Sequence, residues 1–216
     1  MNASDDDPHR DQPVLTAGAE PAKAKAAVIM IHGRGAGAAD IIGLAEIIDR
    51  PALAYLAPEA MRRVWYPNPF MMPVADNQPW LTSAIGVIDR LIAEVGAAGV
   101  PPERVALLGF SQGACLSLEY AARNPRRYGA VLALSGGLIG ERIVAGDYAG
   151  NLAGTPVLFG CSDVDPFIPL DRVVESAAVM KALGGAVTER IYPGAPHTIV
   201  PDEIDNVRRI LDGIAP

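Results

Sequence analysis

An apolar run meets an Ala- and Leu-rich segment in the stretch Arg104-Val105-Ala106-Leu107-Leu108-Gly109-Phe110-Ser111-Gln112-Gly113-Ala114-Cys115-Leu116. The run predicts a buried strand ending at Phe110, and the segment predicts a helix from Gln112 to Arg123. Ser111 stands at the junction in a Gly-x-Ser-x-Gly pattern, the spacing of a nucleophile elbow. So tight a turn strains the serine backbone and requires almost side-chain-free neighbours at Gly109 and Gly113. The stretch therefore predicts an exposed serine nucleophile, with the N–H of Gln112 at the helix N-terminus facing it.

The rest of the chain alternates between short apolar runs and amphipathic segments. Further strands are predicted at 26–31, 52–56, 130–134, 156–159 and 187–192. Further helices are predicted at 39–49, 79–95, 170–183 and 201–214. Repeated strand–helix units of this kind predict an α/β fold, with a mostly parallel sheet covered by helices on both faces. Ligands of such sheets bind outside the carboxyl ends of the strands.

Domain organisation follows from length and from the N-terminal composition. Residues 1–22 contain four Asp, three Pro and little periodic hydrophobicity, so we expect a flexible acidic segment without a chemical role. Residues 23–216 are expected to form a single domain, with no insertion long enough for a separate cap. The acidic start lacks the basic and apolar parts of a secretory signal, which favours a cytoplasmic location.

Composition limits the classes of partner. The formal net charge is -7, whereas a nucleic-acid partner requires clustered Lys and Arg. The apolar runs are too short to span a bilayer, so no stable membrane insertion is expected. Cys115 and Cys161 have no metal or disulfide spacing and are expected to be small buried apolar residues. The expected partners are a small-molecule substrate and, if the protein is oligomeric, a second copy in a homodimer.

A serine nucleophile needs a general base, and the chain has three histidines. His9 lies in the acidic N-terminal segment and is set aside. His32 follows the first predicted strand and is expected to be a structural histidine bonded within its loop. His197 lies between the last predicted strand and the last helix, at the carboxyl edge of the sheet. His197 is therefore the predicted base, its alternative being a loop histidine bonded to backbone.

The imidazole in turn needs a carboxylate to fix its tautomer. Asp163 and Asp165 both follow the predicted strand 156–159. Pro166 holds Asp165 in an extended conformation, whereas Asp163 is better placed to bond its own turn. Asp165 is favoured as the acid and Asp163 is kept as the alternative. The order Ser, Asp, His along the chain is that of the α/β-hydrolases.

Two loops complete the predicted site. The Gly-rich loop His32-Gly33-Arg34-Gly35-Ala36-Gly37 lacks the spacing of a phosphate or dinucleotide loop, and the N–H of Arg34 is the predicted second oxyanion donor beside Gln112. The Arg34 side chain could meet an anionic substrate group or remain solvated. The loop 61–72 carries bulky side chains that could wall an acyl pocket or simply cover the sheet. The predicted substrate-binding residues in it are Trp65, Phe70, Met71 and Met72.

Together these segments resemble the carboxylesterase and acyl-protein thioesterase branch of the α/β-hydrolases, the phospholipase/carboxylesterase family. The likeness rests on the sequences around Gly33, Ser111 and His197 and on Asp165-Pro166, and it extends over nearly everything after residue 25. It implies a compact esterase with Ser111, Asp165 and His197 as its triad and Arg34 and Gln112 as oxyanion donors. The sequence differs from the common family pattern at Ala36, Ala114 and Cys161-Ser162, all outside the triad.

The predicted function is that of a serine carboxylesterase that hydrolyses small esters with short or medium acyl chains through an acyl-enzyme. No metal and no organic cofactor is expected. The alternatives are an acyl-protein thioesterase or lysophospholipase, which needs a longer acyl channel, and a non-catalytic hydrolase-fold binding protein. Dienelactone hydrolase is disfavoured because its resemblance would require Cys at position 111.

Overall fold

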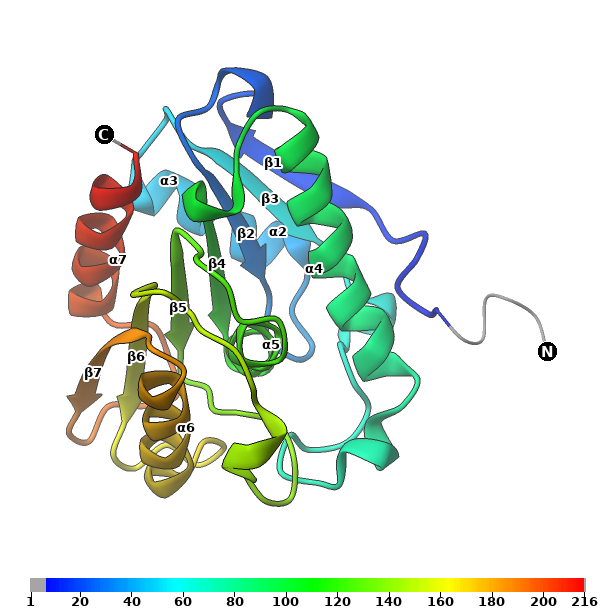
Figure 1. The fold of residues 1–216 in the computed structure, drawn as a ribbon, viewed down its shortest axis with the longest axis vertical. Coiled ribbons are helices and arrows are strands. Elements are labelled where there is room, and N and C mark those ends of the chain that lie inside the picture. Colours follow the sequence, from blue (N-terminus) through cyan, green and yellow to red (C-terminus); the bar gives the residue numbers. More distant parts are fainter. Residues whose placement is uncertain (1–6, 216) are drawn as a thin grey trace.

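The computed structural model describes residues 7–215, whose seven strands form one sheet (Figure 1). The strand order is β1-β3-β2-β4-β5-β6-β7, with β1 antiparallel to β3 and every other neighbouring pair parallel. The strands are β1 (Val14–Gly18), β2 (Ala27–Ile31), β3 (Ala54–Pro58), β4 (Val105–Phe110), β5 (Ala130–Leu134), β6 (Pro156–Ser162) and β7 (Ala186–Tyr192). The central strands β2, β3, β4 and β5 are buried almost throughout, as parallel strands covered on both faces must be.

Helices cover both faces of the sheet. The α-helices are α2 (Ala38–Ile42), α3 (Leu44–Ile48), α4 (Trp80–Ala97), α5 (Gln112–Arg123), α6 (Leu170–Ala182) and α7 (Pro201–Ile214). Short 3-10 helices lie in the connecting segments at Pro21–Lys23, Met61–Arg63, Val74–Asn77, Pro102–Arg104 and Ala145–Asp147. One buried cluster lies between the sheet and α4, α5 and α6, which stand in front of it in Figure 1, and a second lies between the sheet and α2, α3 and α7. The predicted α/β-hydrolase architecture is therefore confirmed.

Most predicted elements agree with the structure to within a few residues. The predicted helix 39–49 is an exception, because it is divided into α2 and α3 at Gly43. Glycine is a poor residue inside a helix, which explains the break. At the end of α3, Asp49 takes a left-handed conformation with φ 53° and closes the segment.

The N-terminal segment differs from the sequence expectation. Residues 1–6 lie outside the described residues, but the expectation of a flexible segment is wrong for the remainder up to residue 22. Val14–Gly18 forms the edge strand β1, and its partner is β3. Only 1% of His9 is exposed. The composition hid this order, because an antiparallel edge strand with little buried side-chain surface carries little hydrophobic signal.

The loops after β2, β3, β4, β6 and β7 gather at one edge of the sheet, because the carboxyl ends of parallel strands point the same way. Those after β2, β4, β6 and β7 carry Arg34, Ser111, Asp165 and His197. Within residues 7–215, no helix combines the length and the apolar character that crossing a bilayer requires.

Candidate functional site

Ser111 lies in a strained turn between β4 and α5. Its backbone has φ 55° and ψ -117°, a conformation that side-chain-bearing residues rarely adopt. The two flanking glycines are required by contact. A Cβ atom on Gly109 would lie 2.2 Å from the carbonyl oxygen of Gly113, and one on Gly113 would lie 2.0 Å from the carbonyl oxygen of Ile31. The turn thus raises the serine above the sheet edge while its backbone packs directly against β2.

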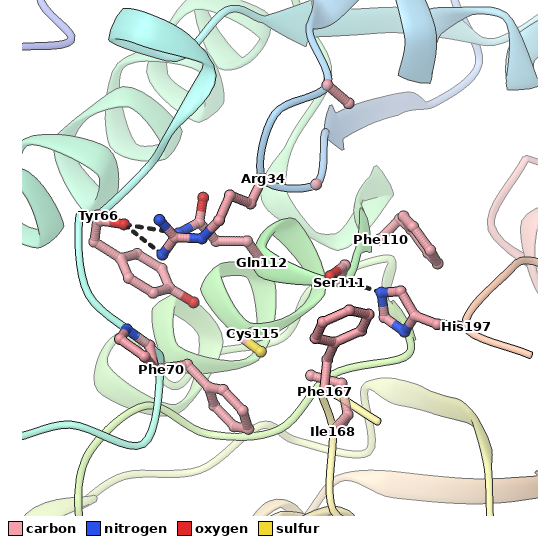
Figure 2. A pocket seen from close by; sticks show the side chains of 13 residues that line it. Arg34, Tyr66, Phe70, Phe110, Ser111, Gln112, Cys115, Phe167, Ile168 and His197 are labelled. Carbon is pink, nitrogen blue, oxygen red and sulfur yellow. Dashed lines mark hydrogen bonds between the residues drawn. The ribbon is translucent and has the colours of Figure 1, made fainter. Parts of the chain in front are cut away.

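A chain of two hydrogen bonds joins three side chains from three loops. His197 Nε2 lies 2.9 Å from Ser111 Oγ, a bond drawn in Figure 2, and His197 Nδ1 lies 2.6 Å from Asp165 Oδ2. These are the distances of a nucleophile, a base and an orienting acid. The structure thus brings together the three residues that the sequence singled out, and it pairs the imidazole with Asp165.

The buried side chain of Asp165 accepts hydrogen bonds from His197, from two backbone amides and, weakly, from the Cys161 thiol. Besides His197, the backbone amides of Phe167 and Ile168 donate to its Oδ1 at 2.9 and 3.0 Å. Burial alone would raise the pKa of Asp165, but the bonds from His197 and from the two amides outweigh it and lower the pKa below its ordinary value. The carboxylate therefore stays ionised and fixed in orientation.

Asp163 has a different partner from the one that the sequence suggested. Its Oδ1 accepts the backbone N–H of Gly194, 2.7 Å away in the loop between β7 and α7. Ser162 Oγ, not Asp163, accepts a bond within the turn, from the N–H of Val164. Asp163 therefore fastens the loop that carries His197, and the prediction that it bonds its own turn is wrong. The long-range contact leaves no trace in local sequence.

The two predicted oxyanion donors come from neighbouring segments, and their side chains hold the same loop. The Arg34 guanidinium donates to the carbonyl oxygens of Tyr66, Pro67 and Asn68 at 2.8–2.9 Å. Gln112 Nε2 donates to the Tyr66 carbonyl at 2.8 Å, and Gln112 Oε1 accepts the N–H of Trp65 at 2.9 Å. The Arg34 residue is exposed, but its guanidinium is committed to three loop carbonyls. It fixes the loop that faces Ser111.

Two buried histidines hydrogen-bond to the backbone of the segment 60–65. His9 Nε2 donates to the Trp65 carbonyl at 3.0 Å, and its Nδ1 accepts the N–H of Met61 at 3.1 Å. His32 Nδ1 donates to the Gly33 carbonyl, and its Nε2 accepts the N–H of Ala60. Burial lowers the pKa of both imidazoles, which suits neutral rings that each donate and accept one bond. The predicted structural role of His32 is confirmed.

A cavity of about 440 Å³ opens beside Ser111 (Figure 2). Its walls are formed by Gly33, Arg34, Ala36, Tyr66, Pro69, Phe70, Phe110, Ser111, Gln112, Cys115, Phe167, Ile168 and His197. Phe70 lies there as predicted. The other three predicted substrate-binding residues do not: Trp65 is fully buried and donates from its indole to the His32 carbonyl, and Met71 and Met72 are exposed outside the cavity. In the Pro-rich loop 61–72, some apolar side chains point inward and others point to solvent. Residue type alone does not reveal which.

Several wall residues were not among the predicted site residues, including Phe110, Phe167, Tyr66 and Cys115. Phe110 and Phe167 flank His197, each with its ring centroid 5.0 Å from that of the imidazole. Tyr66 and Cys115 form part of the wall on the side away from His197. Both cysteines are buried and unpaired, as expected. Closeness in sequence to the triad could have revealed three of them. Phe110 precedes Ser111, Phe167 follows Asp165 by two residues, and Cys115 lies one helical turn after Ser111.

The described residues contain no group of three or more His, Cys, Asp or Glu side chains arranged to hold a metal ion. The arrangement of Ser111, His197 and Asp165 can activate a hydroxyl and accept an acyl group.

The phospholipase/carboxylesterase family model matches residues 12–214. The chain belongs to the phospholipase/carboxylesterase family. Membership makes it a serine hydrolase of the α/β-hydrolase superfamily that acts on ester bonds.

Similar proteins agree with that assignment. The chain is 31% identical to acyl-protein thioesterase 1 of Eremothecium gossypii over 89% of this chain and 88% of that protein. It is 36% identical to acyl-protein thioesterase 1 of Gibberella zeae, although that match spans 56% of this chain and 53% of the relative.

Solved structures point to the same family. The crystal structure of a phospholipase/carboxylesterase from Dyadobacter fermentans is 44% identical, with a TM-score of 0.90 over 93% of this chain and 96% of that chain. Zea mays acyl-protein thioesterase 2, at 18% identity and a TM-score of 0.72 over 95% and 100% of the two chains, shares the fold.

Proposed function

We propose that the protein is a serine carboxylesterase that hydrolyses small carboxylic esters through an acyl-enzyme. The observation that carries the proposal is the continuous hydrogen-bond chain from Ser111 through His197 to Asp165 beside an apolar cavity. A non-catalytic binding protein would have no use for the strained backbone of Ser111.

In the proposed acylation step, Ser111 Oγ attacks the ester carbonyl carbon while His197 Nε2 takes the hydroxyl proton. The buried Asp165 carboxylate accepts the Nδ1–H bond, keeps Nε2 free as the base, and stabilises the imidazolium that forms. The backbone amides of Arg34 and Gln112 are the proposed donors to the tetrahedral oxyanion. The bonds from their side chains to the 65–68 segment hold both residues in place before substrate arrives.

Collapse of the intermediate breaks the bond to the alcohol oxygen, which takes the proton from His197 Nε2 and leaves. A water molecule then repeats the attack on the acyl-enzyme, with His197 again as base, and releases the acid and free Ser111. The alcohol must therefore lie on the His197 side of the cavity, between Phe110 and Phe167, and the acyl group on the opposite side.

The size of the cavity supports short or medium acyl chains. About 440 Å³ is near the lower end of the range of roughly 300–1,000 Å³ for small-molecule pockets. The second candidate is an acyl-protein thioesterase, favoured by the names of the relatives in Eremothecium gossypii and Gibberella zeae. It would need room for a longer acyl chain, which the panel of graded acyl lengths tests.

The test uses p-nitrophenyl esters of graded acyl length beside acyl thioesters and lysophospholipids. We expect an optimum among short or medium esters, with unchanged rates after addition of chelator. Ser111→Ala should lower kcat by on the order of 10³-fold or more and abolish labelling by a fluorophosphonate probe. Undiminished hydrolysis by the alanine variant would contradict the serine mechanism, and an optimum on long-chain thioesters would favour the second candidate.

A further inference from the structure

The Tyr66 hydroxyl is the one buried side-chain nitrogen or oxygen in residues 7–215 that no nitrogen or oxygen partners, and the group beside it is the weakly hydrogen-bonding thiol of Cys115. Only 1% of Tyr66 is exposed, yet the residue lines the cavity beside Ser111. Figure 2 shows its ring extending from the 65–70 loop toward the side of the cavity where Cys115 lies. A buried hydroxyl left unpaired destabilises the folded state, so such groups in native proteins call for an explanation.

The position of the ring is fixed by its backbone. The Tyr66 carbonyl oxygen accepts one bond from Arg34 Nη2 at 2.9 Å and another from Gln112 Nε2 at 2.8 Å. The neighbouring Trp65 N–H is also held, by Gln112 Oε1. These bonds fix the backbone from which the ring extends, and the ring itself is 1% exposed and borders the cavity.

The surroundings of the hydroxyl define the partner. Burial, with the adjacent Cys115, raises the pKa of Tyr66 well above its ordinary value, so the group is a neutral O–H donor. Burial likewise raises the pKa of Cys115 to about 12, so its sulfur stays a neutral thiol, which is a weak hydrogen-bonding group. Apolar walls such as Phe70 and Ile168 disfavour a charged ligand. An uncharged oxygen that accepts a hydrogen bond fits these conditions.

The hydroxyl faces the acyl half of the site, an assignment that depends on the proposed function. His197 must protonate the departing alcohol, so the alcohol lies on its side, with Phe110 and Phe167. Tyr66 lies on the other side of Ser111 in Figure 2. We propose that the preferred substrates carry an uncharged oxygen acceptor in the acyl chain, as an ether, keto or hydroxyl group, which accepts a hydrogen bond from Tyr66.

The test compares p-nitrophenyl hexanoate with isosteres in which an ether oxygen replaces the methylene at carbon three, four or five. We expect at least one isostere to exceed the hexanoate about tenfold or more in kcat/KM for the wild type, because a site built around a polar group discriminates against an analogue that leaves it unpaired. Tyr66→Phe should bring all four esters within about twofold of one another by losing activity on the preferred isostere. Its melting temperature should equal or exceed that of the wild type.

Tyr148→Phe is the matched control, because the Tyr148 hydroxyl already donates to Glu119 and lies outside the cavity. It should keep the oxygen preference and lower the melting temperature. A wild type without preference for any isostere, or a Tyr66→Phe variant that keeps the preference, would overturn the inference and would show that a bound water serves the hydroxyl instead.

Failure of the proposed function is distinguishable from failure of this inference. Ser111-dependent hydrolysis of the hexanoate without an oxygen preference removes the inference alone. If no ester is hydrolysed, calorimetry with hexanamide and the corresponding oxa-amides, which are uncharged, still tests the Tyr66 site. Tighter binding of an oxa-amide that Tyr66→Phe abolishes supports the site, and equal binding contradicts it.

Discussion

The acyl half of the site, formed by the 65–70 loop, and the triad half, formed by the loops of Asp165 and His197, are held mainly by different groups, although Gln112 Oε1 also accepts the Trp65 N–H. On the acyl half, side-chain N–H groups of Arg34, Gln112 and His9 donate to backbone carbonyls of the segment 65–68. On the triad half, side-chain carboxyl groups accept backbone N–H groups. Asp163 holds the Gly194 end of the His197 loop, and Glu203 holds Val200 at its other end, at 2.8 Å.

The difference explains how the 65–68 segment and the His197 loop are both held in fixed positions around Ser111. A loop whose carbonyls are held presents its side chains to the cavity, which suits a wall. A loop whose amides are held at both ends, at Gly194 and Val200, positions His197 between them. The halves should therefore fail differently when their anchors are removed, and the variants below test that contrast in order of expected effect.

The largest effect is expected within the triad half. Asp165→Asn should preserve the fold but present the wrong imidazole tautomer, and lower kcat by about 10⁴-fold. Asp163→Asn should cost far less, since it weakens one loop bond worth roughly 1 kcal/mol. Measurement of kcat and melting temperature for both variants gives the answer. A folded but inactive Asp163→Asn enzyme beside an active Asp165→Asn enzyme would reverse the assignment of the acid.

An intermediate effect is expected in the acyl half. Arg34→Met removes three bonds to loop carbonyls while keeping the backbone amide, so kcat should fall roughly 10- to 100-fold through loss of preorganisation. The free energy of unfolding should fall by about 1–2 kcal/mol, because the guanidinium is largely exposed. Arg34→Lys, with a flexible ammonium, should have a kcat between those of the wild type and Arg34→Met. Urea unfolding and single-turnover kinetics test both variants. An unchanged kcat in Arg34→Met would show that the Arg34 side chain does not preorganise the site.

A smaller, pH-dependent effect is expected at the far anchor of the His197 loop. Burial raises the pKa of Glu203 to about 7, so the folded state binds its proton more tightly than the unfolded state does. Stability should therefore decline as pH rises from about 4.5 through 7, and Glu203→Gln should remove that decline. We expect the variant to be more stable than the wild type by about 2 kcal/mol at pH 8 and nearly equal to it at pH 5. An equal difference at both pH values would contradict the assignment.

The smallest effect is expected at Met71 and Met72. Both side chains are exposed outside the cavity, so their replacement by Ala should leave kcat/KM for every ester within about twofold. Phe70→Ala, the matched change inside the wall, should shift the acyl-length optimum. A shifted optimum in the methionine variants would restore them to the substrate site.

The sequence predicted what local pattern determines. The strand ends, the tight turn at Ser111 and the extended Asp165-Pro166 pair are encoded within a few residues, and so they could be located in advance. It could not predict the partners of Asp163 and Arg34, because those bonds join segments about 30 residues apart. The burial of His9 and the pairing of β1 were hidden by an acidic, Pro-containing context whose order comes from contacts with Trp65 and β3. The direction in which each side chain of the 61–72 loop points also depends on the turns of its backbone. The sequence does not show these turns, and so Trp65 was wrongly assigned to the pocket.

The contact between Gly113 and the Ile31 carbonyl has a consequence for divergence. The spacing between the strand that precedes Arg34 and the helix that begins at Gln112 is set by main chain against main chain, with no side chain between them. Substitutions at Tyr66, Phe70 or Cys115 can therefore reshape the acyl wall without altering the distance between those two segments. Substitutions in the wall of such a protein can change which ester binds while the positions of Arg34 and Gln112 relative to Ser111 stay the same.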